Sequence, residues 1–193
     1  WWNFISESFP EYLSELRSME ERVCLRLPRA NAHQLVERGI RWNARPVAVA
    51  SLPSVEGRLS DLGEHAPLLI WVAGDQVALE QDFAGIVGTR KPSVKGASNA
   101  RRLVASLRMP IVSGCAIGID RAAHEAALEF GLPTVAIMAG GLDKAYPMET
   151  WEMFHQIVRS GGVLMSEMPP GAVPSRFRFL QRNRSIAAMC KEL

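Results

Sequence analysis

From Phe83 onward the chain alternates between short apolar runs and helical stretches, and this alternation limits the folds open to it. Continuous apolar strands separated by helices are typical of a parallel sheet that is covered on both faces. We therefore expect an α/β fold with a doubly wound, mostly parallel sheet. Strands are predicted within 83–90, 109–114, 132–141 and 162–169, and helices within 92–108, 118–130 and 147–161.

The sequence before residue 83 is less regular. Residues 67–75 predict one buried strand, and residues 31–40 predict a short helix capped by Asn31. We expect an N-terminal arm or linker over residues 1–66 and a Rossmann-like core over residues 67–193. The chain lacks an initiator Met, so we expect a piece of a longer protein.

Composition narrows the class of protein further. The net charge is only +2, and no run of 18 apolar residues occurs, so no membrane-spanning helix is predicted. The three cysteines, Cys24, Cys115 and Cys190, lie far apart, which indicates neither a disulfide framework nor a metal site. We expect a cytoplasmic protein without a metal or cofactor.

The loops after the four predicted strands are expected to converge, because ligands of open α/β sheets bind beyond the carboxyl ends of the strands. Three of these loops are rich in Gly or Ser, and exposed backbone N–H groups there favour an anion. Glycines that merely permit tight turns are the alternative. No P-loop or G-x-G-x-x-G pattern is present, but Gly88, Arg90 and Lys91 follow the first strand, and a guanidinium suits a phosphate. The loops span 88–91, 113–120, 139–143 and 166–171.

Ser113, Asp120 and His124 suggest a hydrolase triad, but the G-x-S-x-G elbow of such enzymes is absent. Asp120 is expected in the first turn of a helix, where the helix dipole favours a carboxylate. His124 lies one turn later and is expected to donate a hydrogen bond to Asp120 or to a neighbouring loop. We therefore interpret Asp120 and His124 as structural support for the turn and predict no catalytic residue.

The segment SRFRFLQRNRS, residues 175–185, carries four arginines and no acid. If its first part is extended, alternation places the arginines on one side and Phe177 and Phe179 on the other. Cations that follow a backbone, together with rings for base stacking, are typical of single-stranded nucleic-acid sites. A basic edge with core phenylalanines is the alternative. The arginines are Arg176, Arg178, Arg182 and Arg184.

Five blocks of the sequence, within about Pro67 to Met189, resemble the DNA-processing protein A (DprA/Smf) family of bacteria. They read IVGTRKPSVKG, IVSGCAIGIDRAAHEAAL, TVAIMAGGLDKAYP, GGVLMSEMPPG and FLQRNRSIAAM, in that order. The resemblance implies an extended Rossmann-like domain that binds no dinucleotide and has no enzymatic activity. It also implies that the domain is truncated here at its C-terminus, because the family's sequence continues beyond this point. It also implies a protein, typically a homodimer, that binds and protects incoming single-stranded DNA in natural transformation and helps load the RecA recombinase.

By this resemblance, Arg90 matches the family's DNA-pocket arginine, Ser113 and Gly114 match its pocket-floor turn, and Phe179 matches its aromatic contact. Leu180 and Ser185 depart from the family pattern, which usually has Pro and Ile or Val there. We expect cations to hold phosphates and Phe179 to stack on a base at one rim of the sheet. The expected DNA-binding residues are Gly88, Arg90, Lys91, Ser113, Gly114, Arg176, Phe179, Arg182, Asn183 and Arg184.

Two other functions could use the same crevice. One is a nucleotide-processing hydrolase in which Asp120, His124 or Glu167 acts as acid or base. The other is a sensor of a small nucleotide. A mononucleotide would suffice for either, whereas single-strand binding predicts an affinity that depends on the length of the oligonucleotide.

Overall fold

A computed structural model describes residues 38–39, 43–146 and 148–191. Six strands form one sheet in the order β1-β2-β6-β5-β4-β3. The four strands from β3 to β6 are parallel, while β2 is antiparallel to both β6 and β1. The expected doubly wound, mostly parallel sheet is confirmed. The strands are β1 (Ala44–Ala48), β2 (Leu69–Gly74), β3 (Ala84–Gly85), β4 (Ile111–Ser113), β5 (Thr134–Met138) and β6 (Val163–Ser166).

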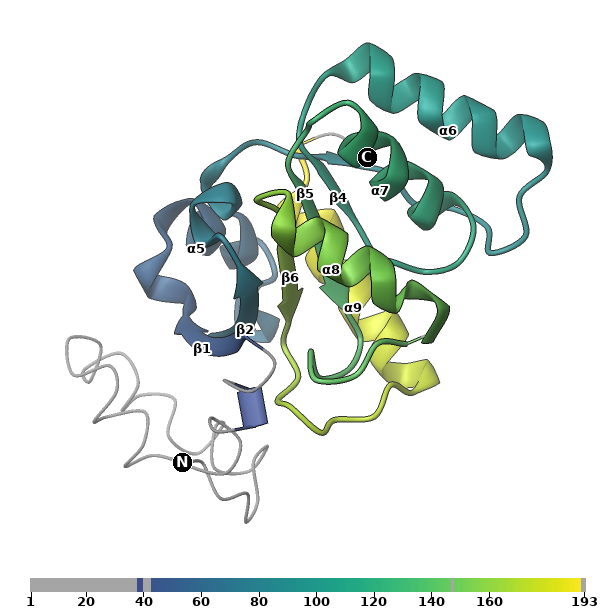
Figure 1. Ribbon diagram of the computed structural model, residues 1–193. Helices are drawn as coiled ribbons and strands as arrows, with labels where there is room; N and C mark the ends of the chain where they lie inside the picture. The colour runs from purple at the N-terminus through teal and green to yellow at the C-terminus, as the bar shows by residue number, and fades with distance from the viewer. Residues whose placement is uncertain (1–37, 40–42, 147, 192–193) are drawn as a thin grey trace.

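Helices cover both faces of this sheet (Figure 1). The helices α6, α7 and α8 lie on one face, and α5 and α9 pack together on the other. Within the described ranges, no helix is both long enough and apolar enough to span a membrane. The helices are α5 (Pro53–Ser60), α6 (Val94–Leu107), α7 (Ile119–Glu129), α8 (Trp151–Arg159) and α9 (Arg176–Met189), with 3-10 turns at Val49–Ser51, Gly63–His65, Gln76–Glu80 and Met148–Thr150.

The strands are apolar on both sides because each side meets a helical layer. In β2, Ile70 and Val72 join the core beneath α5 and α9, whereas Trp71 and Ala73 join the core beneath α8. All four of these side chains are buried. This two-sided burial explains why the strands are continuous apolar runs rather than alternating ones.

Residues before position 67 contribute to the same sheet. Strand β1 pairs with β2 from Ala44 opposite Ala73 to Ala48 opposite Leu69, and Val55 and Leu59 of α5 belong to the core that α9 also covers. The boundary that we expected between residues 66 and 67 stays a prediction. Of the helix expected over 31–40, only residues 38 and 39 are described.

The first part of the segment 175–185 is not extended, because α9 begins at Arg176, so the alternation considered for an extended segment does not apply. Ser175 caps the helix, and its hydroxyl accepts a hydrogen bond from the Arg178 backbone N–H at 3.3 Å. Arg182 and Arg184, two residues apart, therefore point in directions about 200° apart around the helix. They cannot share one side as they would in a strand.

Candidate functional site

Two adjoining cavities, here called the crevice, lie beyond the carboxyl ends of β4 and β5. They measure about 170 Å³ and about 390 Å³. Both are lined by Arg90, Ala116, Phe179 and Arg182, which form the partition between them. The smaller cavity is also lined by Gly114, Met138, Gly140, Lys144 and Tyr146, and the larger one by Gly88, Asp120, Asn183 and Ile186.

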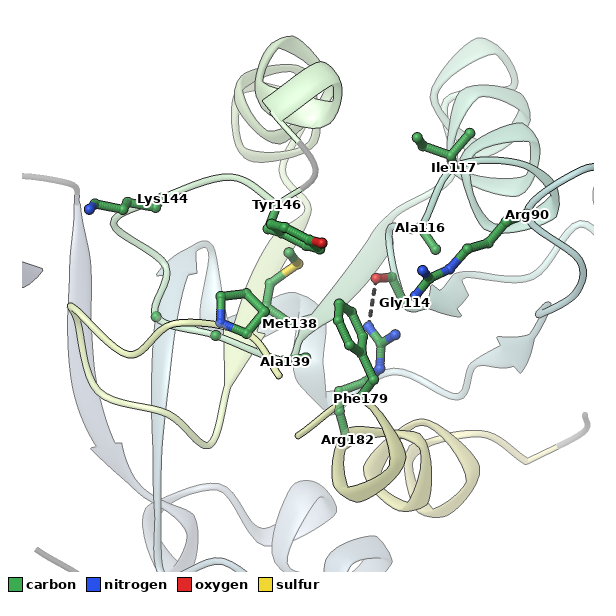
Figure 2. A pocket seen from close by; sticks show the side chains of 13 residues that line it. Arg90, Gly114, Ala116, Ile117, Met138, Ala139, Lys144, Tyr146, Phe179 and Arg182 are labelled. Atoms are coloured by element: carbon green, nitrogen blue, oxygen red, sulfur yellow. Dashed lines mark hydrogen bonds between the residues drawn. The ribbon is translucent and has the colours of Figure 1, made fainter. Parts of the chain in front are cut away.

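Phe179 stands at the centre of the crevice, and the guanidinium groups of Arg90 and Arg182 lie beside its ring (Figure 2). The Cζ atom of Arg90 lies 5.0 Å from the centre of its ring, and that of Arg182 lies 5.7 Å from it. The Tyr146 ring meets the same phenyl ring with centroids 5.8 Å apart and planes tilted by 47°. Both guanidinium distances fall within the range of a cation–π interaction, so the ring and the cations hold one another in place.

Arg182 connects α9 to the ends of two strands. Its guanidinium Nη1 donates hydrogen bonds to the carbonyl oxygens of Gly114, at 2.6 Å, and Ile137. Burial lowers the pKa of Arg182, and the carboxylate of Asp120 opposes this effect. Gly114 leaves just enough room, since a Cβ atom there would lie 2.5 Å from Nη1 of Arg182. Arg182 thus serves as a buried anchor of the crevice floor.

Asp120 connects the Arg90 loop to the start of α7. Its carboxylate accepts hydrogen bonds from the backbone N–H groups of Gly88, at 3.3 Å, and Ala116, at 3.4 Å. Burial raises the pKa of Asp120, and these N–H groups oppose the rise. The Ile119 backbone N–H also donates to the Thr89 carbonyl at 3.2 Å. The loop that carries Arg90 is therefore held firmly.

His124 contacts a strand, not the loop that we expected. Its Nδ1 lies 2.7 Å from Thr134 Oγ1, whose own hydroxyl donates to the Ile111 carbonyl at 3.1 Å. Nδ1 therefore carries the proton, and Nε2 is buried without a partner among the described residues. Burial, with a smaller effect from Arg182, lowers the pKa of His124 to about 3. His124 thus joins α7 to β5 as a neutral ring.

Several expected DNA contacts are exposed at or near the crevice. Arg90, Lys91 and Asn183 are exposed, and Arg90 and Lys91 form no ion pair with any residue in the described part of the chain. Gly88 is exposed in the same loop as Arg90. Arg176 is exposed at the first residue of α9. These side chains leave positive charge free for a ligand.

The structure does not bring Ser113 and Arg184 into the crevice. Ser113 is fully buried, and its hydroxyl donates to the Ile86 carbonyl at 2.6 Å, which joins β4 to the end of β3. Arg184 pairs with Glu167 at 2.5 Å and donates to the His65 carbonyl. Arg184 lines neither cavity, because the helical path turns it away from Arg182. The expected gathering of Arg90 and Arg184 at one rim is therefore not observed.

The sequence analysis missed a cation and an aromatic ring that line the smaller cavity. Lys144 and Tyr146 follow β5, just beyond the loop 139–143 that we considered. A cation and an aromatic ring soon after a strand end are the sequence signal that would have identified them.

Cys115, the neighbour of Gly114, is fully buried, and this burial raises the pKa of its thiol. Among residues 38–39, 43–146 and 148–191, no group of three His, Cys, Asp or Glu side chains could hold a metal ion.

Comparison with known proteins gives concordant matches. A family model described as DNA recombination-mediator protein A matches residues 51–193. A Mycobacterium tuberculosis relative that carries the name DNA processing protein DprA is 41% identical over 152 residues, which are 75% of this chain and 38% of that protein. The X-ray structure of DNA processing protein A from Streptococcus pneumoniae matches with a TM-score of 0.65 and 34% identity, over 75% of this chain and 51% of that one.

A structure of DNA processing protein A from Helicobacter pylori, reported for its unique mode of binding single-stranded DNA, matches with a TM-score of 0.60 and 29% identity. The match covers 67% of this chain and 60% of that one. The chain thus spans less than two thirds of the length of each of these three proteins. Since the family model covers most of the sequence and the fold agrees with two solved members, the chain belongs to the DNA recombination-mediator protein A family.

Proposed function

We propose that this chain binds single-stranded DNA in the crevice between α9 and the ends of β4 and β5. The observation that carries the proposal is the stack of Arg90 on Phe179, at 5.0 Å, with the cationic side exposed. A ring for base stacking beside an unpaired guanidinium for phosphate is the combination that sequence-tolerant single-strand binders use.

The expected contacts differ in their roles in this proposal. Arg90 and Lys91 attract phosphates from the rim, and Phe179 stacks on a base. Arg182 acts mainly through position, because two strand-end carbonyl groups already occupy its Nη1. Arg176, at the exposed start of α9, extends the positive rim. Arg184 has no role in it, because its charge is paired with Glu167.

The finer functions that we infer for this protein go beyond the binding itself. We propose that it protects incoming single-stranded DNA, helps load the RecA recombinase in natural transformation and recombination, and acts as a cytoplasmic homodimer without catalysis. Membership of the family and the Helicobacter pylori relative's binding of single-stranded DNA support this inference.

The geometry gives little support to the hydrolase. His124 is fully buried, lines neither cavity and stays neutral because burial lowers its pKa to about 3. Glu167 is occupied by Arg184 and by the hydroxyl of Ser185. Asp120 is the only one of the three candidates that lines the crevice in the described part of the chain, and backbone N–H groups occupy both of its oxygens.

The proposal is tested by fluorescence anisotropy with labelled single-stranded and double-stranded oligonucleotides over a range of salt concentrations. Single strands are expected to bind more tightly, with an affinity that depends on length. Arg90→Ala is expected to weaken binding to all sequences alike and to reduce the slope of log K against log salt by about 0.7, the value for one phosphate contact.

Arg159→Ala is the matched control. Arg159 is an exposed arginine and the last residue of α8. The chain runs from there into the start of β6, so Arg159 lies at the amino ends of the parallel strands, whereas the crevice lies at their carboxyl ends. Its removal is expected to leave both affinity and salt slope unchanged. Equal effects of the two substitutions, or tight binding of a mononucleotide with no gain from greater length, would contradict the proposal.

A further inference from the structure

Positive charge is concentrated in one part of the sequence, residues 83–119. This segment contains six arginines and lysines and no Asp or Glu, so it carries a net charge of +6. The whole chain carries only +2, and the remaining residues are therefore net negative. Helix α6 supplies three of the six cations, and the Arg90 loop before it supplies two. A charge distribution of this kind attracts a polyanion to one region of a molecule whose total charge is small.

Four polar residues form an exposed stripe along α6, here called the α6 stripe. Their spacing of four, three and four residues places them on one side of the helix. On the opposite side, Ala100 and Val104 are buried in the core that α6 shares with the alanines of α7. The stripe therefore faces away from the core along most of the helix. Its residues are Lys95, Asn99, Arg102 and Ser106, all of them exposed.

The arginines beside the stripe have structural roles, whereas the two cations of the stripe have none. Arg101 pairs with Glu129 of α7. Arg108 caps the end of α6, where a cation suits the negative end of the helix dipole. Lys95 and Arg102 form no ion pair with any residue that the structure describes, and Lys95 lies in the first turn, where the dipole disfavours a cation. Stability of the fold does not explain these two charges.

The helix beside the stripe does not neutralise it. Helix α7 packs against α6 (Figure 1), and each of its acidic side chains is already engaged. The Asp120 carboxylate accepts backbone N–H groups beside the crevice, Glu125 pairs with Arg121 at 2.8 Å, and Glu129 pairs with Arg101. The charge of the α6 stripe is therefore available to a ligand from solution.

The α6 stripe begins close to the crevice. Lys95 follows Arg90 by five residues, and Ser93 between them caps α6 by accepting the Gly96 backbone N–H at 3.1 Å. Lys95 and Arg102 are about 10 Å apart along the axis, at about 1.5 Å per residue. Phosphates of one strand are about 3.4 Å apart along a duplex and farther apart in an extended strand. A strand held at Arg90 can therefore reach both cations within a few phosphates.

We propose that the α6 stripe binds the phosphates of the single strand that leaves the crevice past Arg90, with Lys95 and Arg102 as the charged contacts and Asn99 as a neutral donor between them. This inference rests on the proposed function and extends it beyond the crevice. Because α6 contains no aromatic residue, binding along it is electrostatic and independent of the bases.

The first experiment observes Lys95 in the unmodified protein. Exposed lysines are acetylated in the presence of oligothymidylates of about 6 to about 30 nucleotides, which bracket the site sizes of known single-strand binders, and mass spectrometry measures the labelling. The long oligonucleotides are expected to protect Lys95, and the shortest are not. Lys191 is the matched control, because it is exposed and lies beside the start of β3, away from the carboxyl ends of the strands. Equal protection of the two lysines at every length would overturn the proposal.

The second experiment measures the salt dependence of binding by anisotropy. The double variant Lys95→Gln/Arg102→Gln is expected to reduce the slope for long oligonucleotides by about 1.4, which is two phosphate contacts, and to keep the slope for the shortest ones. Lys95→Arg/Arg102→Lys retains both charges and is expected to keep the slope at every length. Arg45→Gln/Arg159→Gln is the matched control, because it removes the same charge from exposed positions on β1 and α8.

The outcomes separate this inference from the proposed function. If the unmodified chain fails to bind single-stranded DNA, or if Arg90→Ala has no effect at any length, the proposed function itself fails. If binding depends on Arg90 but the double variant of α6 matches its control at every length, the strand does not follow α6, and only the present inference is overturned. An acidic protein surface would then be the ligand that this charge suits. Circular dichroism of each variant verifies that the comparison is made between folded proteins.

Discussion

At the scale of single residues, the lowered pKa of His124 allows a prediction of how the free energy of unfolding changes with pH. Its pKa is lowered from 6.5 to about 3 because the ring is fully buried, so the unfolded chain binds a proton that the folded one excludes. The free energy of unfolding should fall as pH drops through this window, by about 1.4 kcal/mol per pH unit from this residue. Chemical denaturation at pH 7, 6 and 5 measures the slope.

His124→Gln provides the comparison for that prediction, because the amide does not titrate. The variant is expected to show a smaller loss of stability from pH 7 to pH 5, whatever its stability at pH 7. Burial raises the pKa of Asp120, so proton uptake by this carboxylate favours the folded state as pH drops toward 4, which is the opposite sign to the effect of His124. Asp120 titrates in both proteins, and its contribution to the free energy of unfolding therefore cancels in the difference between them. Parallel slopes in the two proteins would show that His124 is protonated in the folded state.

At the scale of elements, the junction between the Arg90 loop and α7 depends on one glycine. Gly118 has a φ of +99°, and a Cβ atom there would lie 2.3 Å from the Thr89 carbonyl oxygen. Gly131, at the other end of α7, also has a positive φ, of +65°, but open space around it. Gly131→Ala is expected to cost about 1–2 kcal/mol of stability from the backbone alone. Gly118→Ala should cost more and should also weaken DNA binding, since it displaces Arg90.

Denaturant unfolding and anisotropy on the same two variants test this prediction. Gly131→Ala is expected to retain the affinity of the unmodified protein, because it lies at the far end of α7 from the crevice. If Gly118→Ala retained full affinity as well, the position of the Arg90 loop would not depend on its contact with the helix.

At the start of α9, the sequence pattern did not decide between an extended segment and a helix. An amphipathic helix is recognised by apolar residues at helical spacing, but the buried side of α9 includes Arg182 and Ser185. Alternating Arg and Phe imitates a strand over the first four residues. Arg90 and Phe179, which meet in the crevice, were predicted as DNA contacts from local chemistry and from the family resemblance. The burial of Arg182 and the pairing of Arg184 follow from the helical path and were not predictable from spacing.

At the scale of the whole molecule, the parallel half of the sheet was predictable because each strand is buried on both faces and reads as a continuous apolar run. Strand β1 was not, since five residues with two alanines and Pro46 carry little strand signal. Lys144 and Tyr146 were missed for a related reason. Their position in the crevice depends on contacts between two loops that lie far apart in the sequence, those after β5 and β6.

Because α5 packs into the same core as α9, we can predict whether the molecule unfolds as one unit. Leu59 is fully buried in the core that α9 and the middle of the sheet share, although it precedes the boundary expected after residue 66. Leu59→Ala is expected to lower the free energy of unfolding by about 2–5 kcal/mol. If residues 44–66 are one cooperative unit with the core, hydrogen exchange should quicken in β4 and β5 as much as in α5. Glu56→Ala, on the exposed side of the same helix, should change little. Loss of protection confined to α5 would instead support a boundary at residues 66 and 67, with the crevice built on a separately stable core.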